Sequence, residues 1–358
     1  MKVSSKIGIF ALCVALFLAC GFMNPETSEA ADTVYKWRAV THSLSGTEDY
    51  KIIQEFCEMV NKASNGRLVI EPFGAGVLFP VFDSFDAIKN GIVELSMCST
   101  GYWTGKDPMF AAFATRPGCP IRSYHEVMYL DRAAYPVMKE LYAKHGLTLL
   151  GTFDACTPEP LMLAKKPIQS IQDFKGMNIR TSGMGTQFYQ ALGASAVSLS
   201  GPEIYTALQL GTIDAAEWTN WQENMEMGFH EVVKYALDPA VHIGATSSKF
   251  LTVNPKKWEA LPEDLKTIVL LAMDHARYQS ALKMHSSDEF YKRKWIESGV
   301  EVVSLPAEDF KEMQKVGMKV YKEYVEKAPN GQAYLEIYAR VLHELGYEEE
   351  ARFYGYGQ

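Results

Sequence analysis

Two segments decide the fold of this chain: DFKGMNIR at residues 173–180 and GTIDAAEW at residues 211–218. Each is typical of the strand of a βα unit. The first ends on Arg180, and the second ends on Glu217 and Trp218. Ligands of α/β proteins usually bind at strand ends. A guanidinium in such a place makes two parallel, charge-assisted hydrogen bonds to a carboxylate, so the pattern indicates a site for small organic acids.

Further βα units are predicted on both sides of these segments. Before them, apolar strands are predicted at residues 35–40, 68–70 and 93–97, and helices alternate with these strands. This order implies a parallel sheet. A second series of strands, which predicts a second sheet, begins at 147–151 and continues at residues 177–179, 196–199 and 215–218. The apolar strand at 250–253 comes too late to extend that sheet simply and is expected to cross back to the first.

The sequence thus predicts an α/β protein with two lobes and a ligand cleft between them. Roughly 325 mature residues of ordinary composition suffice for two domains. Lobe I is predicted at residues 33–152 with 247–285, and lobe II at 153–246 with 286–358, which includes the C-terminal helices. Several crossings of the chain between the lobes predict a hinge, and long helical patterns run from residue 262 to about residue 294.

The first thirty residues are typical of a secretory signal. Two lysines precede an apolar stretch at 7–19, which is too short to span a bilayer, and a small-residue run follows near Ala31. Residues 1–30 are therefore predicted to be removed, and the mature chain is predicted to lie in a bacterial periplasm. Cys20 offers an alternative cleavage point, at which the mature protein would carry a lipid anchor.

The charge of the chain limits the partners it can bind, and its cysteines limit the disulfides it can form. The chain has 35 Lys and Arg against 43 Asp and Glu, a net charge of −8, with both signs interspersed, which argues against nucleic acid as a partner. Four of the six cysteines follow the predicted signal, and no pair has CxxC spacing. A core this large does not need disulfides, so buried free thiols and a Cys98 to Cys156 bridge both stay open.

Several loose motifs, taken in order, carry a resemblance to a known family. Besides the two segments above, they are NGRL at 65–68, FGAG at 73–76, SFDA at 84–87 and GKDP at 105–108. Over nearly all of its mature length the chain resembles the extracytoplasmic solute receptors of TRAP transporters, the DctP-type binding proteins. Within that family it is most similar to the branch for 2-oxo and 2-hydroxy monocarboxylates. The resemblance implies two lobes that close over a ligand, and delivery of that ligand to TRAP membrane subunits.

The resemblance also implies roles for particular residues. Arg180 is expected to hold the substrate carboxylate, unless it pairs only with an acid of its own lobe. Tyr102 and Trp103 match an aromatic pair on the first-lobe side of the cleft. Trp218 is expected to be a pocket wall or a core residue. Weaker candidates for shaping the pocket around the substrate side chain are Asn220 and His242.

A metal ion is expected to bridge protein and substrate. In the oxo-acid branch an acid and backbone at the positions of Glu217 and Trp218 hold the ion with a glutamine, and Glu159 stands near the place of that glutamine. If both acids face the cleft with the substrate carboxylate, three negative charges meet one Arg180. Two like charges about 4 Å apart cost about 4 kcal/mol at an effective dielectric of about 20, so the site needs a cation.

The expected ligands of that ion are hard oxygens, which favour Ca²⁺ or Na⁺, and the extra carboxylate favours Ca²⁺. One alternative is that Glu159 points away from the cleft. Another is a receptor for a different carboxylate, aromatic or dicarboxylic, that binds without a metal.

The sequence lacks the signatures of common enzymes. Residues 183–188 begin like a dinucleotide-binding loop, but Phe188 replaces the third glycine. No HExxH, GxSxG or paired-cysteine motif occurs. The chain is therefore predicted to be a receptor, and a secreted hydrolase with an unrecognised site is the enzyme alternative. A break at 328–331 interrupts the C-terminal helices, which favours a monomer over a helix-mediated dimer.

Overall fold

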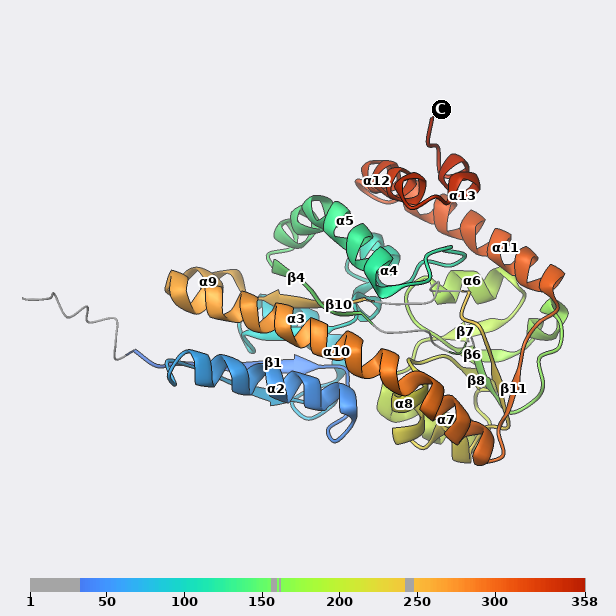
Figure 1. The fold of residues 1–358 in the computed structure, drawn as a ribbon, viewed down its shortest axis with the longest axis horizontal. Coiled ribbons are helices and arrows are strands. Elements are labelled where there is room, and N and C mark those ends of the chain that lie inside the picture. Colours follow the sequence, from blue (N-terminus) through green and yellow to red (C-terminus); the bar gives the residue numbers. More distant parts are fainter. Residues whose placement is uncertain (1–32, 156–159, 161, 242–247, 358) are drawn as a thin grey trace, which may run out of the picture.

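The computed structural model describes residues 33–155, 160, 162–241 and 248–357. Two sheets divide these residues into two α/β lobes, and helices cover both sheets (Figure 1). The predicted two-lobed α/β architecture is confirmed. No helix in these ranges has the length and apolar character that a bilayer crossing requires. The predicted signal segment lies outside the described part of the chain.

The first sheet has five strands in the order β2-β1-β3-β10-β4. Their bounds are β1 Tyr35–Thr41, β2 Leu68–Phe73, β3 Leu95–Cys98, β4 Thr148–Ala155 and β10 Ser248–Val253. β1 is parallel to β2 and β3, as predicted. β10 runs antiparallel between β3 and β4, so the predicted return of 250–253 to this sheet is confirmed. The strand at 147–151 does not open the second sheet, because β4 pairs with β10 at the edge of the first.

Helices cover both faces of the first sheet. On one face lie α2 (Glu48–Ala63) and α10 (Glu263–Glu297), and on the other lie α3 (Ser84–Lys89), α4 (Pro108–Ala114) and α5 (Tyr124–Lys144). α9 (Pro255–Glu259) follows β10. α2 begins after Thr47, whose side chain caps the first turn by accepting from the Tyr50 N–H. Asp49 lies in that first turn, where a carboxylate is favoured by the helix dipole.

The second sheet has six short strands in the order β11-β9-β5-β8-β6-β7. Their bounds are β5 Met162–Ala164, β6 Asn178–Arg180, β7 Ser195–Val197, β8 Ala215–Ala216, β9 Tyr235–Leu237 and β11 Glu301–Val303. Its nearby helices are α6 Gly185–Ala191, α7 Gly201–Leu210 and α8 Trp221–Glu226. β6 is parallel to β7 and to β8. This pairing brings Arg180, at the end of β6, beside Glu217, directly after β8.

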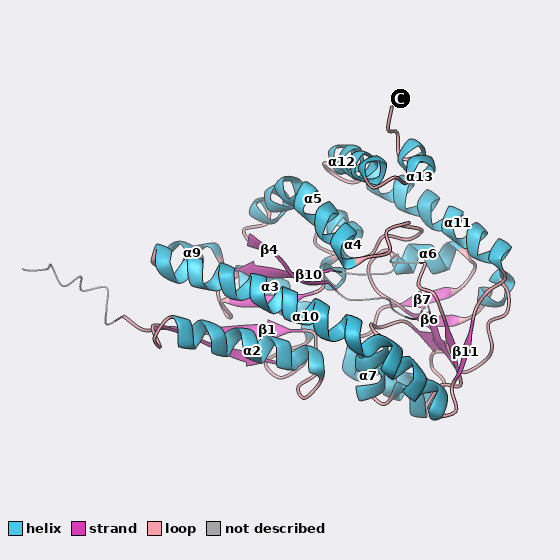
Figure 2. Cartoon of the chain, viewed as in Figure 1, coloured by secondary structure: helices cyan, strands magenta, loops and turns pink. Residues whose placement is uncertain are grey.

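α10 connects the two lobes. This 35-residue helix packs on α2 and β4 of lobe I and on α8 and β11 of lobe II (Figure 2). The predicted long helix is confirmed. The chain also passes between the sheets after β4 and after β9. Several crossings of this kind are the arrangement expected of a hinge between two lobes.

The C-terminal helices pack differently from the prediction. They are α11 (Ala307–Glu326), α12 (Gly331–Glu344) and α13 (Glu348–Phe353). α11 contacts both α6 and α4, but α12 packs on α5 of lobe I and α13 packs on α12 (Figure 1). The Tyr321 hydroxyl donates to the Ala112 carbonyl at 2.9 Å, and Arg116 Nε donates to the Tyr334 hydroxyl at 3.2 Å. These helices are predicted to belong to lobe II, whereas the buried Tyr321 and Tyr334 have their polar partners on lobe I.

The contact of α11 with lobe I gives a stability prediction. A Cβ at Gly317 would lie 2.6 Å from the Gly118 backbone nitrogen. Gly317→Ala is therefore expected to lower the free energy of unfolding by about 1–3 kcal/mol, although alanine is the better helix former. Chemical denaturation measures this change. Lys319→Ala, on the exposed face of the same helix, is the control and is expected to change stability by less than about 0.5 kcal/mol. A Gly317→Ala protein more stable than the wild type would contradict the close packing.

Candidate ligand-binding site

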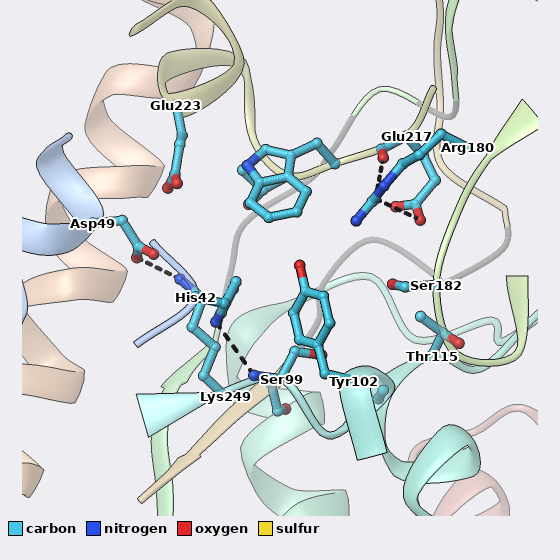
Figure 3. A pocket seen from close by; sticks show the side chains of 14 residues that line it. His42, Asp49, Ser99, Tyr102, Thr115, Arg180, Ser182, Glu217, Glu223 and Lys249 are labelled. Atoms are coloured by element: carbon cyan, nitrogen blue, oxygen red, sulfur yellow. Dashed lines mark hydrogen bonds and ion pairs between the residues drawn. The ribbon is translucent and has the colours of Figure 1, made fainter. Parts of the chain in front are cut away.

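A cavity of about 50 Å³ lies between the two lobes. Such a volume has room for about four water-sized molecules, or for a small organic molecule. Lobe I lines it with His42, Asp49, Ser99, Tyr102, Ala114, Thr115, Ser248 and Lys249, and lobe II with Arg180, Ser182, Glu217, Trp218, Thr219 and Glu223. Figure 3 shows two polar ends: Arg180 with Glu217, and Asp49 with Glu223 and Lys249. The Tyr102 and His42 side chains lie between these ends.

Arg180 is buried, with 1% of its surface exposed, and is held by two strand ends of lobe II. Its Nε and Nη2 donate to the Leu199 carbonyl at 3.0 and 2.8 Å. Its Nη1 donates to the Glu217 carbonyl at 2.6 Å and pairs with Glu217 Oε1 at 3.4 Å. The sequence left open whether Arg180 faces the cleft or pairs with an acid of its own lobe. In the structure Arg180 does both: its guanidinium pairs with Glu217 and also lines the cavity.

Aromatic rings enclose the guanidinium. The Trp218 ring centroid lies 4.8 Å from Arg180 Cζ, a cation–π arrangement. Gly201, at the start of α7, allows this placement, because a Cβ there would lie 2.7 Å from the indole. Tyr102 reaches the same space from lobe I, and burial raises the pKa of its hydroxyl, so it stays a neutral donor. The His42 ring lies 5.7 Å from the Tyr102 ring and 5.8 Å from the Trp218 ring.

Glu217, directly after β8, is an acid of lobe II that pairs with Arg180. Its Oε1 accepts from the Thr181 hydroxyl at 3.0 Å, and 4% of the residue is exposed. Within the described ranges no three His, Cys, Asp or Glu side chains gather as a metal site. The acidic and hydroxyl donors that line the cavity are all oxygens, which fit a hard cation such as Ca²⁺ or Na⁺. Glu159, the other expected metal ligand, lies outside the described residues.

The opposite end of the cavity contains a buried ion-pair cluster that the sequence did not reveal. Lys249 of β10 pairs with Asp49 Oδ1 and, at 3.1 Å, with Asp154 Oδ2. Burial by itself raises the pKa of Asp49, but the ammonium of Lys249, together with His42 and the Ser43 hydroxyl, outweighs burial and holds that pKa below its usual range. Burial, aided by Lys249, lowers the pKa of His42 to about 3, so this imidazole is neutral at physiological pH. Its Nδ1 accepts from the Ser99 N–H at 3.3 Å.

Glu223 of α8 adds a third acid at this end. It is 3% exposed, and burial, followed by the nearby Asp49, raises its pKa well above the usual range. Asn220 positions it by capping α8, since the Asn220 side-chain oxygen accepts from the Glu223 N–H at 2.9 Å. No local motif marks Asp49, Glu223 and Lys249 together, because they come from three distant segments.

Of the predicted site residues, the structure brings together Arg180, Glu217, Trp218 and Tyr102. Trp103 does not line the cavity: its indole donates to Ser84 Oγ at 2.9 Å inside the lobe I core.

Asn220 is likewise absent from the lining residues, because its side chain is committed to the helix cap. His242 and Cys156 lie outside the described residues. Within the described ranges Cys57, Cys98 and Cys119 are buried free thiols.

The chain is similar in sequence to known solute-binding proteins. The model of the family "bacterial extracellular solute-binding protein, family 7" (DctP) matches residues 41–328. A monocarboxylate 2-oxoacid-binding periplasmic protein of Nostoc is 26% identical and aligns over 88% of this chain and 86% of its own. The 2,3-diketo-L-gulonate-binding periplasmic protein of Escherichia coli is 24% identical, over 88% of this chain and 94% of its own.

Solved structures show the same fold. A TRAP solute-binding protein of Bordetella bronchiseptica, with copurified calcium and picolinate, has a TM-score of 0.78 at 25% identity, over 90% of this chain and 96% of its own. One from Colwellia psychrerythraea, with bound calcium and pyruvate, has a TM-score of 0.81 at 23% identity, over 90% and 99%. Because the family model covers most of the chain and both lobes match these structures, this chain belongs to the DctP family of TRAP-type extracellular solute-binding proteins.

Proposed function

We propose that the chain is a periplasmic receptor that captures a small monocarboxylate, a 2-oxo or 2-hydroxy acid, in the cavity between its lobes and delivers it to TRAP membrane subunits. The observation that carries this proposal is the buried Arg180, which is prealigned by two strand ends and faces a cavity walled by Trp218 and Tyr102. A fixed guanidinium binds a carboxylate with little loss of conformational entropy. The 2-oxoacid-binding relative from Nostoc supports the substrate class.

Capture follows from the positions of the lining residues. The substrate carboxylate approaches the guanidinium of Arg180 from the cavity, while the Leu199 carbonyl accepts from Nε and Nη2 and the Glu217 carbonyl accepts from Nη1. Tyr102 donates from lobe I to the same carboxylate, so binding draws the lobes together. Closure removes the acid from water and strengthens these charge-assisted hydrogen bonds.

A hard cation, Ca²⁺ or Na⁺, is part of this proposal. It would be held by the Glu217 carboxylate and the Trp218 backbone carbonyl, with Glu159 as a further expected ligand. The cation would supply positive charge that offsets the acids and the substrate carboxylate in a buried space. The calcium- and pyruvate-bound relative supports this part of the proposal.

A thermal-shift titration with and without chelator tests both parts. Pyruvate and lactate are expected to raise the melting temperature, because ligand that binds only the native state stabilises it by mass action, by about 2.7 kcal/mol at a hundredfold excess over Kd. Prior treatment with EDTA and dialysis is expected to remove most of the shift. A full shift after chelation would show that no cation is needed for binding and would leave Arg180 as the anchor of the carboxylate. No shift with any 2-oxo or 2-hydroxy acid would contradict the proposed substrate class.

A further inference from the structure

Two buried polar atoms on the cavity wall have no hydrogen-bond partner in the described ranges: Trp218 Nε1 and Glu223 Oε2. Both residues line the cavity, and Glu223 is 3% exposed. A buried polar group without a hydrogen-bond partner is unfavourable, so such groups are rare unless a ligand or a water molecule satisfies them. Two of them on one small cavity point to a group supplied by the ligand.

These two atoms are near each other. The Trp218 indole lies close enough to Glu223 to oppose, as a donor, the rise in the pKa of the carboxyl that burial causes. The two groups nevertheless do not form a hydrogen bond of good geometry. Trp218 also spans the cavity, because its ring faces Arg180 while its Nε1 lies at the Glu223 end. A ligand whose carboxylate is on Arg180 therefore has a second polar contact within the reach of one indole.

The surroundings of Glu223 show that its carboxyl faces the cavity end rather than a structural partner. In Figure 3 it extends from lobe II toward Asp49 of lobe I. The cation of this end, Lys249, is already paired with Asp49 and Asp154. The His42 imidazole is neutral, with a pKa lowered to about 3 by burial. Glu223 is thus held in the cavity by its helix, and among the described residues it forms no ion pair of its own.

We propose that Trp218 Nε1 and the Glu223 carboxyl form a recognition site for a hydroxyl group, so that the preferred ligand is a hydroxylated carboxylate. A hydroxyl oxygen accepts from the indole N–H while its hydrogen is donated to Glu223, which satisfies both atoms with one group. A keto oxygen also accepts from the indole N–H but has no hydrogen to donate, so it contacts Glu223 only through a proton carried by the carboxyl. A methyl group satisfies neither atom. This inference rests on the proposed function, because it takes Arg180 as the anchor of the carboxylate.

Calorimetric titration with matched acids tests the inference. The probes are lactate, 3-hydroxypropanoate, pyruvate and the parent acid propanoate. In the wild type, the better hydroxy acid is expected to bind on the order of tenfold to a hundredfold more tightly than propanoate, with pyruvate between them. Glu223→Leu is expected to reduce the ratio of hydroxy acid to propanoate affinity by about fivefold or more. Trp218→Phe, which keeps a ring and removes the N–H, is expected to reduce it similarly.

Two further variants control the experiment. Glu223→Gln keeps an acceptor of similar size and is expected to keep most of the hydroxyl preference. Glu226→Gln, at an exposed position of the same helix, retains an acceptor for the Glu48 N–H and is expected to leave the ratio unchanged.

The outcomes separate this inference from the proposed function. A wild type that binds propanoate as tightly as both hydroxy acids, or an unchanged ratio in both the Leu and the Phe variant, would overturn the hydroxyl site and leave the acid receptor. Failure of every acid to bind would overturn both. If Glu223→Leu does not fold, the Trp218→Phe variant decides.

Discussion

Arg180→Met is expected to abolish binding of every small acid and to lower the free energy of unfolding by about 3–5 kcal/mol, the usual effect of breaking a buried ion pair. The guanidinium donates to the Leu199 and Glu217 carbonyls and pairs with the Glu217 carboxylate, and methionine can do none of this. Calorimetric titration measures the affinity, and chemical denaturation measures the stability. A folded Arg180→Met protein with wild-type affinity would show that Arg180 does not anchor the carboxylate.

Arg180→Lys separates the charge from the geometry. Lysine keeps a cation but lacks the planar fork, so it cannot reproduce the fixed, paired hydrogen bonds that the guanidinium makes to the strand ends and offers to a carboxylate. We expect affinity for lactate or pyruvate to fall about tenfold or more, since a hydrogen bond between charged groups contributes about 1.5–3 kcal/mol. The loss of stability should be smaller than in Arg180→Met. Unchanged affinity in the lysine variant would mean that only the positive charge matters.

Lys249→Met is expected to have the second large effect, on stability. Lys249 is buried between Asp49 and Asp154, and its removal leaves two acids close together without their cation. A loss of about 3–5 kcal/mol at neutral pH is expected. Without the lysine, the folded-state pKa values of both acids rise above the unfolded values of about 4. The penalty is therefore largest above the raised folded-state pKa values and shrinks as the pH falls from those values toward about 4, below which both the folded and the unfolded state are protonated.

The exposed Lys257 provides the matched control for that variant. It pairs with Glu94 at 3.3 Å, but its side chain is 47% exposed, so Lys257→Met should cost less than about 1 kcal/mol. Adding Asp49→Asn to Lys249→Met is expected to recover part of the lost stability, because one uncompensated acid is removed. A Lys249→Met protein as stable as the Lys257→Met control would show that the buried cluster does not matter.

The strands of the fold were predictable where apolar runs alternate with helices. The units that end on Arg180 and Glu217 have that pattern, and the structure places both in one sheet. β5 and β9 were missed, because three apolar residues between loops give no periodicity. The placement of β4 was missed for another reason: pairing with β10 brings together segments about one hundred residues apart, which local pattern does not encode.

The cavity residues divide along the same line. Arg180, Glu217 and Trp218 end short strands, where ligands of α/β folds bind, so the sequence could point to them. Sequence could not decide between Tyr102 and Trp103, which are adjacent in one turn; only Tyr102 lines the cavity. Asp49 and Glu223 come from different lobes and meet only in the folded protein. Lys249 had a signal that was overlooked, a single cation in the otherwise uncharged strand SKFLTV.

Native mass spectrometry of the folded protein, as purified and after addition of lactate or pyruvate, tests the central claim most directly. The receptor assignment predicts one acid per chain, carried together with one Ca²⁺ or Na⁺, and its loss in Arg180→Met. If the spectra show only the mass of the apo protein after lactate or pyruvate is added in large excess, the receptor assignment is contradicted.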